Sequence, residues 1–176
     1  LKEEFALQYR YARIIAQGNE VPRLDRKLQF PEGVRPHESL PLFTEHATGY
    51  AYRCVRRMNP AAEFDEVLVW VKALWSTLSV VACAALARLV FRGHLPAVAS
   101  GLLFGLAPAS MYRSVLSLAH EDFALPLLFG GFAGLVASLR GVTAPARFFG
   151  AALAGLLWSM ALLTWHFARF FLIAQA

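Results

Sequence analysis

Acidic side chains are almost absent from the C-terminal 110 residues of this 176-residue chain. Residues 67–176 contain seven lysines and arginines but only two acids, the adjacent Glu121 and Asp122. Residues 1–66, by contrast, hold ten of the seventeen basic residues and ten of the twelve acids. Charged side chains are costly to place in hydrocarbon, so a long acid-poor stretch is typical of membrane-spanning helices. The sequence therefore predicts a polar extramembrane segment, residues 1–66, followed by an integral membrane segment.

Four apolar runs in the second segment predict four transmembrane helices. They cover about residues 67–91, 95–112, 123–139 and 148–165. Each run is close to the length of roughly 20 residues that crosses the hydrocarbon core of a bilayer. Glycine and alanine recur in these runs, and small residues allow transmembrane helices to pack closely. We therefore predict an all-α fold, a polytopic membrane helix bundle.

The polar segment predicts a loop with two short helices before the first span. Residues 3–19 are typical of an amphipathic helix, because acids open the stretch, apolar residues recur at helical spacing, and Gly18 and Asn19 end it. Residues 20–37 contain three prolines, which indicates a loop. Residues 38–58 are apolar enough for a second helix, with Pro41 in its first turn.

The composition excludes several classes of protein. Hydrophobic residues make up 57% of the chain and charged residues 16%, whereas a soluble domain has about 45–50% and about 25%. The excess of apolar residues also excludes a disordered chain. The formal net charge is +5, but the cations do not gather on one polar face, so we expect no nucleic-acid partner. The expected partner of the apolar runs is the lipid bilayer.

The basic residues of two short loops predict the orientation in the membrane. Arg88 and Arg92 lie between the first and second spans, and Arg140 and Arg147 lie between the third and fourth. These loops share a side, and the positive-inside rule assigns that side to the cytoplasm. Residues 1–66 and the turn before the third span then face the opposite, extracytoplasmic side. Several arginines on that outer side count against the assignment.

The two isolated acids are the sharpest candidate for a functional site. Together with His120 they could hold a divalent cation at the membrane surface. Carboxylate oxygens favour magnesium or manganese, and an imidazole shifts the preference towards manganese. The alternative is structural: Asp122 would cap the third span, Glu121 would be favoured by the helix dipole, and Pro126 would lie in the first turn. Spacing alone favours this structural explanation.

A second acidic pair lies near the start of the chain. Glu3 and Glu4 open the first predicted helix on the same outer side, and they could complete a metal site with the pair near residue 121. The structural alternative is again a favourable charge at a helix N-terminus, and spacing alone favours it.

Three segments resemble the N-terminal half of the oligosaccharyltransferase catalytic subunit, a polytopic membrane enzyme of the GT-C type. Residues 9–33 are similar to the first outer loop of that family, and Phe30-Pro31-Glu32-Gly33 matches its Tyr-Pro-x-Gly turn. Residues 113–122, RSVLSLAHED, are similar to its Arg-Ser-Val-Ala-Gly-x-x-Asp-x-Glu stretch. Residues 162–171 are similar to its Trp-Gly-Gly stretch, although both glycines are replaced.

The resemblance implies specific roles for four residues. His120 and Asp122 fall on the first and last positions of the family's Asp-x-Asp or Asp-x-Glu metal motif, and the histidine removes one negative charge. Glu4 falls on the position of the family's catalytic aspartate. The resemblance thus implies that Glu4, His120 and Asp122 bind one Mn or Mg ion, with Glu4 and Asp122 catalytic. Arg113 is a candidate contact for a substrate phosphate.

The activity implied by the resemblance is protein glycosylation on the extracytoplasmic face. Members of the family transfer a glycan from a polyprenyl (pyro)phosphate carrier to a protein acceptor, usually the Asn of an Asn-x-Ser/Thr sequence. The family's Trp-Trp-Asp acceptor motif and soluble C-terminal domain do not occur in these residues, so we expect no activity from this stretch alone. Two alternatives stay open: another GT-C transferase that uses a polyprenyl monophosphate sugar, and a non-catalytic transporter or scaffold.

Overall fold

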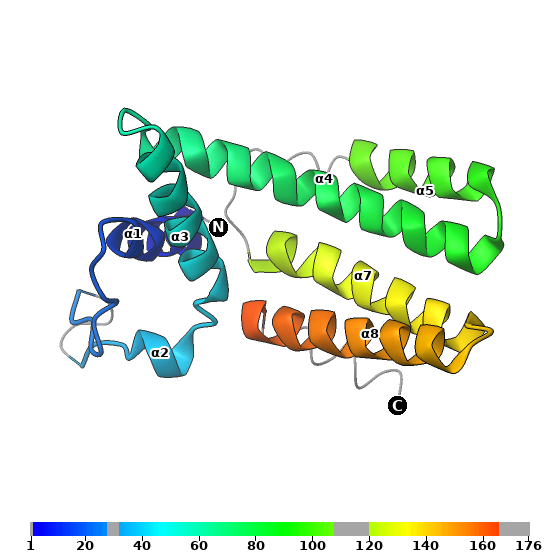
Figure 1. Cartoon of the computed structure of the whole chain (residues 1–176). Helices are drawn as coiled ribbons and strands as arrows, with labels where there is room; N and C mark the ends of the chain where they lie inside the picture. Colours follow the sequence, from blue (N-terminus) through cyan, green and yellow to red (C-terminus); the bar gives the residue numbers. More distant parts are fainter. Residues whose placement is uncertain (1, 28–31, 108–119, 166–176) are drawn as a thin grey trace. The chain divides into compact units, whose positions relative to one another are not determined.

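The computed structural model describes residues 2–27, 32–107 and 120–165, with side chains from Ala6 onward (Figure 1). Within these residues the regular structure is entirely helical, apart from one isolated bridge between Asp25 and Val34. The all-α prediction is therefore confirmed. The helices are α1 (Lys2–Ala16), α2 (Pro36–Ser39), α3 (Phe43–Met58), α4 (Phe64–Phe91), α5 (His94–Leu106), α7 (His120–Arg140) and α8 (Ala144–Thr164).

Several helices begin earlier than the apolar runs that predict them. α4 begins at Phe64 and α7 at His120, so each takes an acidic pair into its first turn. Acids there are stabilised by the helix dipole, which lets a helix extend beyond its apolar stretch. α8 begins at Ala144, where the Thr143 hydroxyl accepts a hydrogen bond from the Ala146 amide at 3.4 Å. Helix bounds therefore follow capping and charge as well as hydropathy.

The helix predicted over residues 38–58 is in fact two helices, so the described residues before α4 form three helices rather than two. α2 ends at Ser39, and Leu40 adopts an extended conformation with φ −127° and ψ 139°. Leu40 precedes Pro41, and the proline ring disfavours helical backbone in the residue before it. The chain re-enters a helix at Phe43.

The chain forms two compact units, residues 1–71 and residues 72–176, with the boundary inside α4. In the first unit α1 packs against α3, and Tyr11, Ile15, Val21 and Leu42 form a buried cluster. The helices approach closely at Gly49, where a Cβ atom would lie 2.7 Å from the Cγ2 atom of Ile15. Only glycine fits this crossing.

The loop after α1 reverses direction at Gly18. This residue has φ +84°, in the left-handed region that glycine enters without strain. Its amide donates to the Ile15 carbonyl at 2.9 Å, and the Asn19 amide donates to the Ile14 carbonyl at 3.1 Å. These bonds satisfy carbonyls at the end of α1 and direct residues 20–27 back along the helix.

In the second unit, α4 and α7 run in the same direction. The Trp75 indole donates to the Phe123 carbonyl at 2.8 Å, which joins the N-terminal parts of the two helices. The Arg140 guanidinium donates to the Val90 carbonyl at 3.2 Å, which joins their C-terminal ends. The α4–α5 and α7–α8 loops therefore lie at the same end of this unit, as the sequence predicts.

α7 and α8 pack with their backbones almost in contact. A Cβ atom on Gly150 would lie 2.8 Å from the Ser138 amide nitrogen and 2.9 Å from the Gly134 carbonyl. Such closeness is what small residues permit between membrane helices. At the turn, the Arg147 side chain donates to the Gly141 carbonyl at 2.7 Å. α7 and α8 thus form a tightly closed helical hairpin.

Three of the described helices, α4, α7 and α8, are long and apolar enough to span a membrane. α5 is apolar but has 13 residues, and the rest of the predicted second span, residues 108–112, lies outside the described residues. Large apolar side chains on these helices are exposed, which suits contact with lipid rather than water. They include Leu74, Leu102, Leu103, Phe148 and Leu156.

Candidate functional site

The predicted site residues of the second unit lie together at the start of α7. His120, Glu121 and Asp122 are all helical, so Asp122 lies inside the first turn and is not the N-cap that the structural alternative requires. His120 is buried, with 7% of its surface exposed, and the two acids are partly buried. These three ionisable groups therefore lie at the start of a helix, and their role as a site stays a prediction.

α4 contributes a basic partner that the sequence analysis did not connect to the acids. Lys72 and Asp122 attract each other electrostatically. One turn further along α4, the Trp75 ring packs against the Phe123 ring with centroids 5.4 Å apart. This contact and the indole hydrogen bond fix the first turn of α7 against α4. Asp122 therefore has a positive charge close by, which lowers the cost of a carboxylate at membrane depth.

Pro126 weakens the hydrogen bonding of the same turn. It lies inside α7, beyond the first turn in which the sequence placed it. A proline has no amide proton, so the Asp122 carbonyl cannot accept the usual bond from residue 126. The neighbouring Phe123 carbonyl accepts a bond from the Trp75 indole. The first turn of α7 is therefore held in part by a donor from α4.

Glu121 has a carboxylate oxygen that could accept a further bond. Its Oε2 atom is buried and has no hydrogen-bond partner among the described residues. A buried acceptor without a partner is costly, and a cation or a donor on a ligand would remove that cost. The chemistry of this oxygen therefore fits a hard divalent ion. In the described part of the chain, no group of three or more His, Cys, Asp or Glu side chains is arranged to hold a metal.

The structure describes the other predicted site residues, Glu4 and Arg113, only in part or not at all. Glu4 lies in α1 of the first unit, and its side chain is outside the described set. His120 and Asp122 belong to the second unit. Arg113 lies outside the described residues. The shared metal site of Glu4, His120 and Asp122 therefore stays a prediction.

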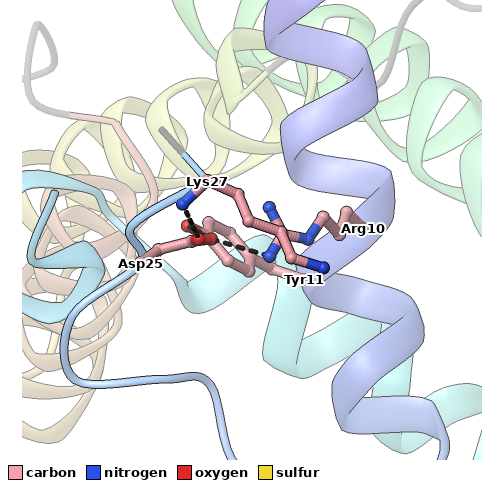
Figure 2. Close-up of polar contacts among 4 residues, drawn as sticks. All are labelled: Arg10, Tyr11, Asp25 and Lys27. Carbon is pink, nitrogen blue, oxygen red and sulfur yellow. Dashed lines mark hydrogen bonds and ion pairs between the residues drawn. The ribbon is translucent and has the colours of Figure 1, made fainter. Parts of the chain in front are cut away.

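A buried carboxylate in the first unit was not found by sequence reasoning. Asp25 has 3% of its surface exposed and accepts three bonds (Figure 2). The Tyr11 hydroxyl donates at 3.0 Å, the Arg10 guanidinium at 2.9 Å, and the Lys27 amide at 3.0 Å. Asp25 thereby attaches the loop of residues 20–27 to α1. The sequence signal was weak, because the three side chains approach only after the reversal at Gly18.

The environment of Asp25 shifts two pKa values. Burial alone would raise the pKa of the Asp25 carboxyl, but the bonds from Lys27, Tyr11 and Arg10 outweigh it and lower the pKa below its ordinary value. Burial, together with the bond to Asp25, raises the pKa of the Tyr11 hydroxyl well above its ordinary value. The pair is therefore a charged carboxylate and a neutral phenol at physiological pH, which is the arrangement that the hydrogen bond requires.

The helices and their exposed apolar surfaces define the class of this molecule as an all-α membrane protein. Comparisons with known proteins do not narrow that class. No protein-family model matches the chain, and neither the curated proteins nor the solved structures give a match.

Proposed function

We propose that this protein is a membrane glycosyltransferase that moves a glycan from a polyprenyl (pyro)phosphate carrier to a protein acceptor on the extracytoplasmic side. The observation that carries the proposal is the cluster of Lys72, His120, Glu121 and Asp122 at one end of the apolar helices. Ionisable groups at membrane depth mark functional sites by default. The resemblance of residues 9–33 and 113–122 to the oligosaccharyltransferase subunit supplies the reaction class.

The groups of this cluster suit the departure of a phosphate. When a sugar–phosphate bond breaks, negative charge grows on the leaving oxygens. His120, Asp122 and Glu4 would hold a Mn or Mg ion, and such an ion would offset that charge when bound. Lys72 supplies a fixed positive charge at the same place. A carboxylate beside the acceptor, assigned to Glu4, would orient its poorly nucleophilic nitrogen.

The second candidate function is a non-catalytic membrane scaffold or transporter. The attraction between Lys72 and Asp122 favours it, because a basic and an acidic side chain can meet in a membrane solely to neutralise each other. In that case the first turn of α7 would hold the helices together and bind no substrate. The two functions differ in what removal of the Asp122 charge does to glycan transfer.

The test uses membranes that contain the protein made from its complete reading frame. They receive a labelled polyprenyl-pyrophosphate glycan and an Asn-x-Ser/Thr peptide, with Mn or Mg present. We expect Asp122→Asn and Glu4→Gln to reduce transfer at least 100-fold, as loss of a major electrostatic contribution does. Glu66→Gln, an exposed acid in the first turn of α4, is the matched control and should transfer normally.

Chelation of the metal should stop transfer, and added Mn should restore it. Normal transfer by a correctly folded Asp122→Asn protein would exclude the catalytic assignment and favour the scaffold. Transfer that survives chelation would exclude the metal, and with it the metal-binding roles of Glu4, His120 and Asp122.

A further inference from the structure

A second polar site lies in the first unit, on the side of α3 that faces the loop after α1. It is a cavity of about 540 Å³, here called the α1–α3 cavity. His46, Tyr50 and Arg53 line it from α3, at the spacing of one helical face. Arg23 and His37 line it from the loop and from α2. None of these residues belongs to the cluster at α7.

The cavity has an excess of positive charge. Glu20 is the one acid among its described lining residues. Within the described part of the chain, neither Arg23 nor Arg53 forms an ion pair with a carboxylate. The neighbouring cavity at Tyr9 shows the contrast, because its two arginines are matched by two acids there, Glu63 and Asp65. The α1–α3 cavity therefore has two guanidinium groups available for an anionic ligand.

Aromatic side chains hold the cationic groups in place. The Arg53 guanidinium lies over the Tyr50 ring, 5.7 Å from its centroid. The His46 ring stacks on the Tyr50 ring, with the two centroids 6.0 Å apart and an angle of 25° between the planes. A stacked guanidinium keeps its N–H donors directed outwards and loses little freedom on binding. His37 is fixed separately, through the bond between its Nε2 atom and the Val21 carbonyl at 3.1 Å.

We propose that the α1–α3 cavity binds a phosphate ester of a sugar or polyol. Arg23 and Arg53 bind the phosphate, because guanidinium groups match its geometry with paired hydrogen bonds. The imidazole of His46 lies beside it as a further donor, and His37, whose Nε2 atom bonds the Val21 carbonyl, forms part of the wall. Tyr50 has 54% of its surface exposed, which leaves apolar surface next to the guanidinium for the carbon skeleton of the ligand. The cavity is far larger than a phosphate ion, which is why an esterified group is inferred.

This chemistry occurs both in soluble sugar phosphates and in the headgroups of anionic phospholipids. The test therefore uses the full chain in two settings. In neutral detergent micelles, binding of glucose 1-phosphate and of inorganic phosphate is measured by calorimetry. In nanodiscs of phosphatidylcholine, with and without phosphatidylglycerol, the same titration shows whether the lipid headgroup already occupies the cavity. Saturable glucose 1-phosphate binding that phosphatidylglycerol blocks identifies a headgroup site, and binding unaffected by the lipid identifies a soluble ligand.

Variants distinguish the cavity from general attraction by a basic protein. We expect Arg53→Gln to weaken glucose 1-phosphate binding about tenfold, as loss of one charge-assisted contact does, and Arg53→Lys to restore part of the affinity. Arg57→Gln removes the same charge from the same helix but does not line the cavity, so it should bind normally. Equal weakening by the two glutamine variants, or no saturable binding in either setting, would overturn the proposal. Because it concerns a separate site, glycan transfer by Asp122→Asn has no bearing on it.

Discussion

Replacement of Asp25 by asparagine is the most direct test of how the first unit is held together. The carboxylate is almost fully buried and accepts three bonds of 2.9–3.0 Å. Asparagine has the same shape, and its remaining oxygen can still accept from the Lys27 amide. It loses the negative charge that the Tyr11 hydroxyl and the Arg10 guanidinium bind. The variant therefore removes charge-assisted bonds while leaving the packing almost unchanged.

The size of the loss follows from those two bonds. A hydrogen bond to a charged group contributes about 1.5–3 kcal/mol. The Arg10 side chain is 35% exposed, so solvent screens its ion pair to about 0.5 kcal/mol, and the Tyr11 bond supplies most of the loss. We expect Asp25→Asn to lower the free energy of opening this loop by about 2–3 kcal/mol in all. At about 1.4 kcal/mol per factor of ten, hydrogen exchange should accelerate about 30- to 150-fold.

Two amides report on this loop specifically. The Asp25 amide donates to the Val34 carbonyl at 2.8 Å, and the Val34 amide donates to the Asp25 carbonyl at 3.1 Å. Their exchange is measured by NMR on the full chain in micelles. Glu32→Gln removes an exposed charge near the same loop and should leave both rates unchanged. The reasoning would be refuted if Asp25→Asn and Glu32→Gln exchanged at the same rates.

Three further predictions concern pH and packing. The folded pKa of Asp25 lies below its unfolded value. The contribution of its carboxylate to stability is therefore complete above the unfolded value of about 3.9 and is lost as pH falls through the folded pKa. The protection of the Asp25 and Val34 amides against exchange should fall in acid, but not in the Asp25→Asn variant. Gly150→Ala should destabilise the helical hairpin by about 1–3 kcal/mol in a detergent unfolding titration, whereas Gly155→Ala, with nothing within 4 Å of the new methyl group, should not. Trp75→Phe keeps a ring but loses the indole donor, so the melting temperature should drop by the equivalent of about 1 kcal/mol, while Trp70→Phe, at a residue 73% exposed, should match the parent protein.

The long helices were predictable because their signal lies within each run of sequence. Hydropathy identified the apolar stretches of α4, α7 and α8 without knowledge of their neighbours. The first turns of α4 and α7 were missed, because an acid at a helix N-terminus cannot be told from an acid in a loop by hydropathy. The break between α2 and α3 had a local cause at Pro41, whose effect on the residue before it outweighs the apolar character of the stretch.

Contacts between distant residues were not predictable in the same way. Scarcity of acids identified the cluster at His120 and Asp122, but the approach of Lys72 depends on how α4 and α7 are rotated about their axes. No periodicity of a single helix encodes that rotation. Tyr11 and Asp25 are 14 residues apart, and their bond exists only because Gly18 turns the chain back. The residues that build sites here are those whose partners are remote in sequence.

The close passage of Gly134 and Gly150 has a consequence for how the protein is made. Two helices that touch along their backbones and are joined by a turn of three residues, 141–143, have no room for lipid between them at the crossing. Their mutual surface can therefore form as soon as both have left the ribosome, without contacts from the helices made before them. During biosynthesis, α7 and α8 are then expected to leave the translocon for the bilayer as one object rather than as two successive segments.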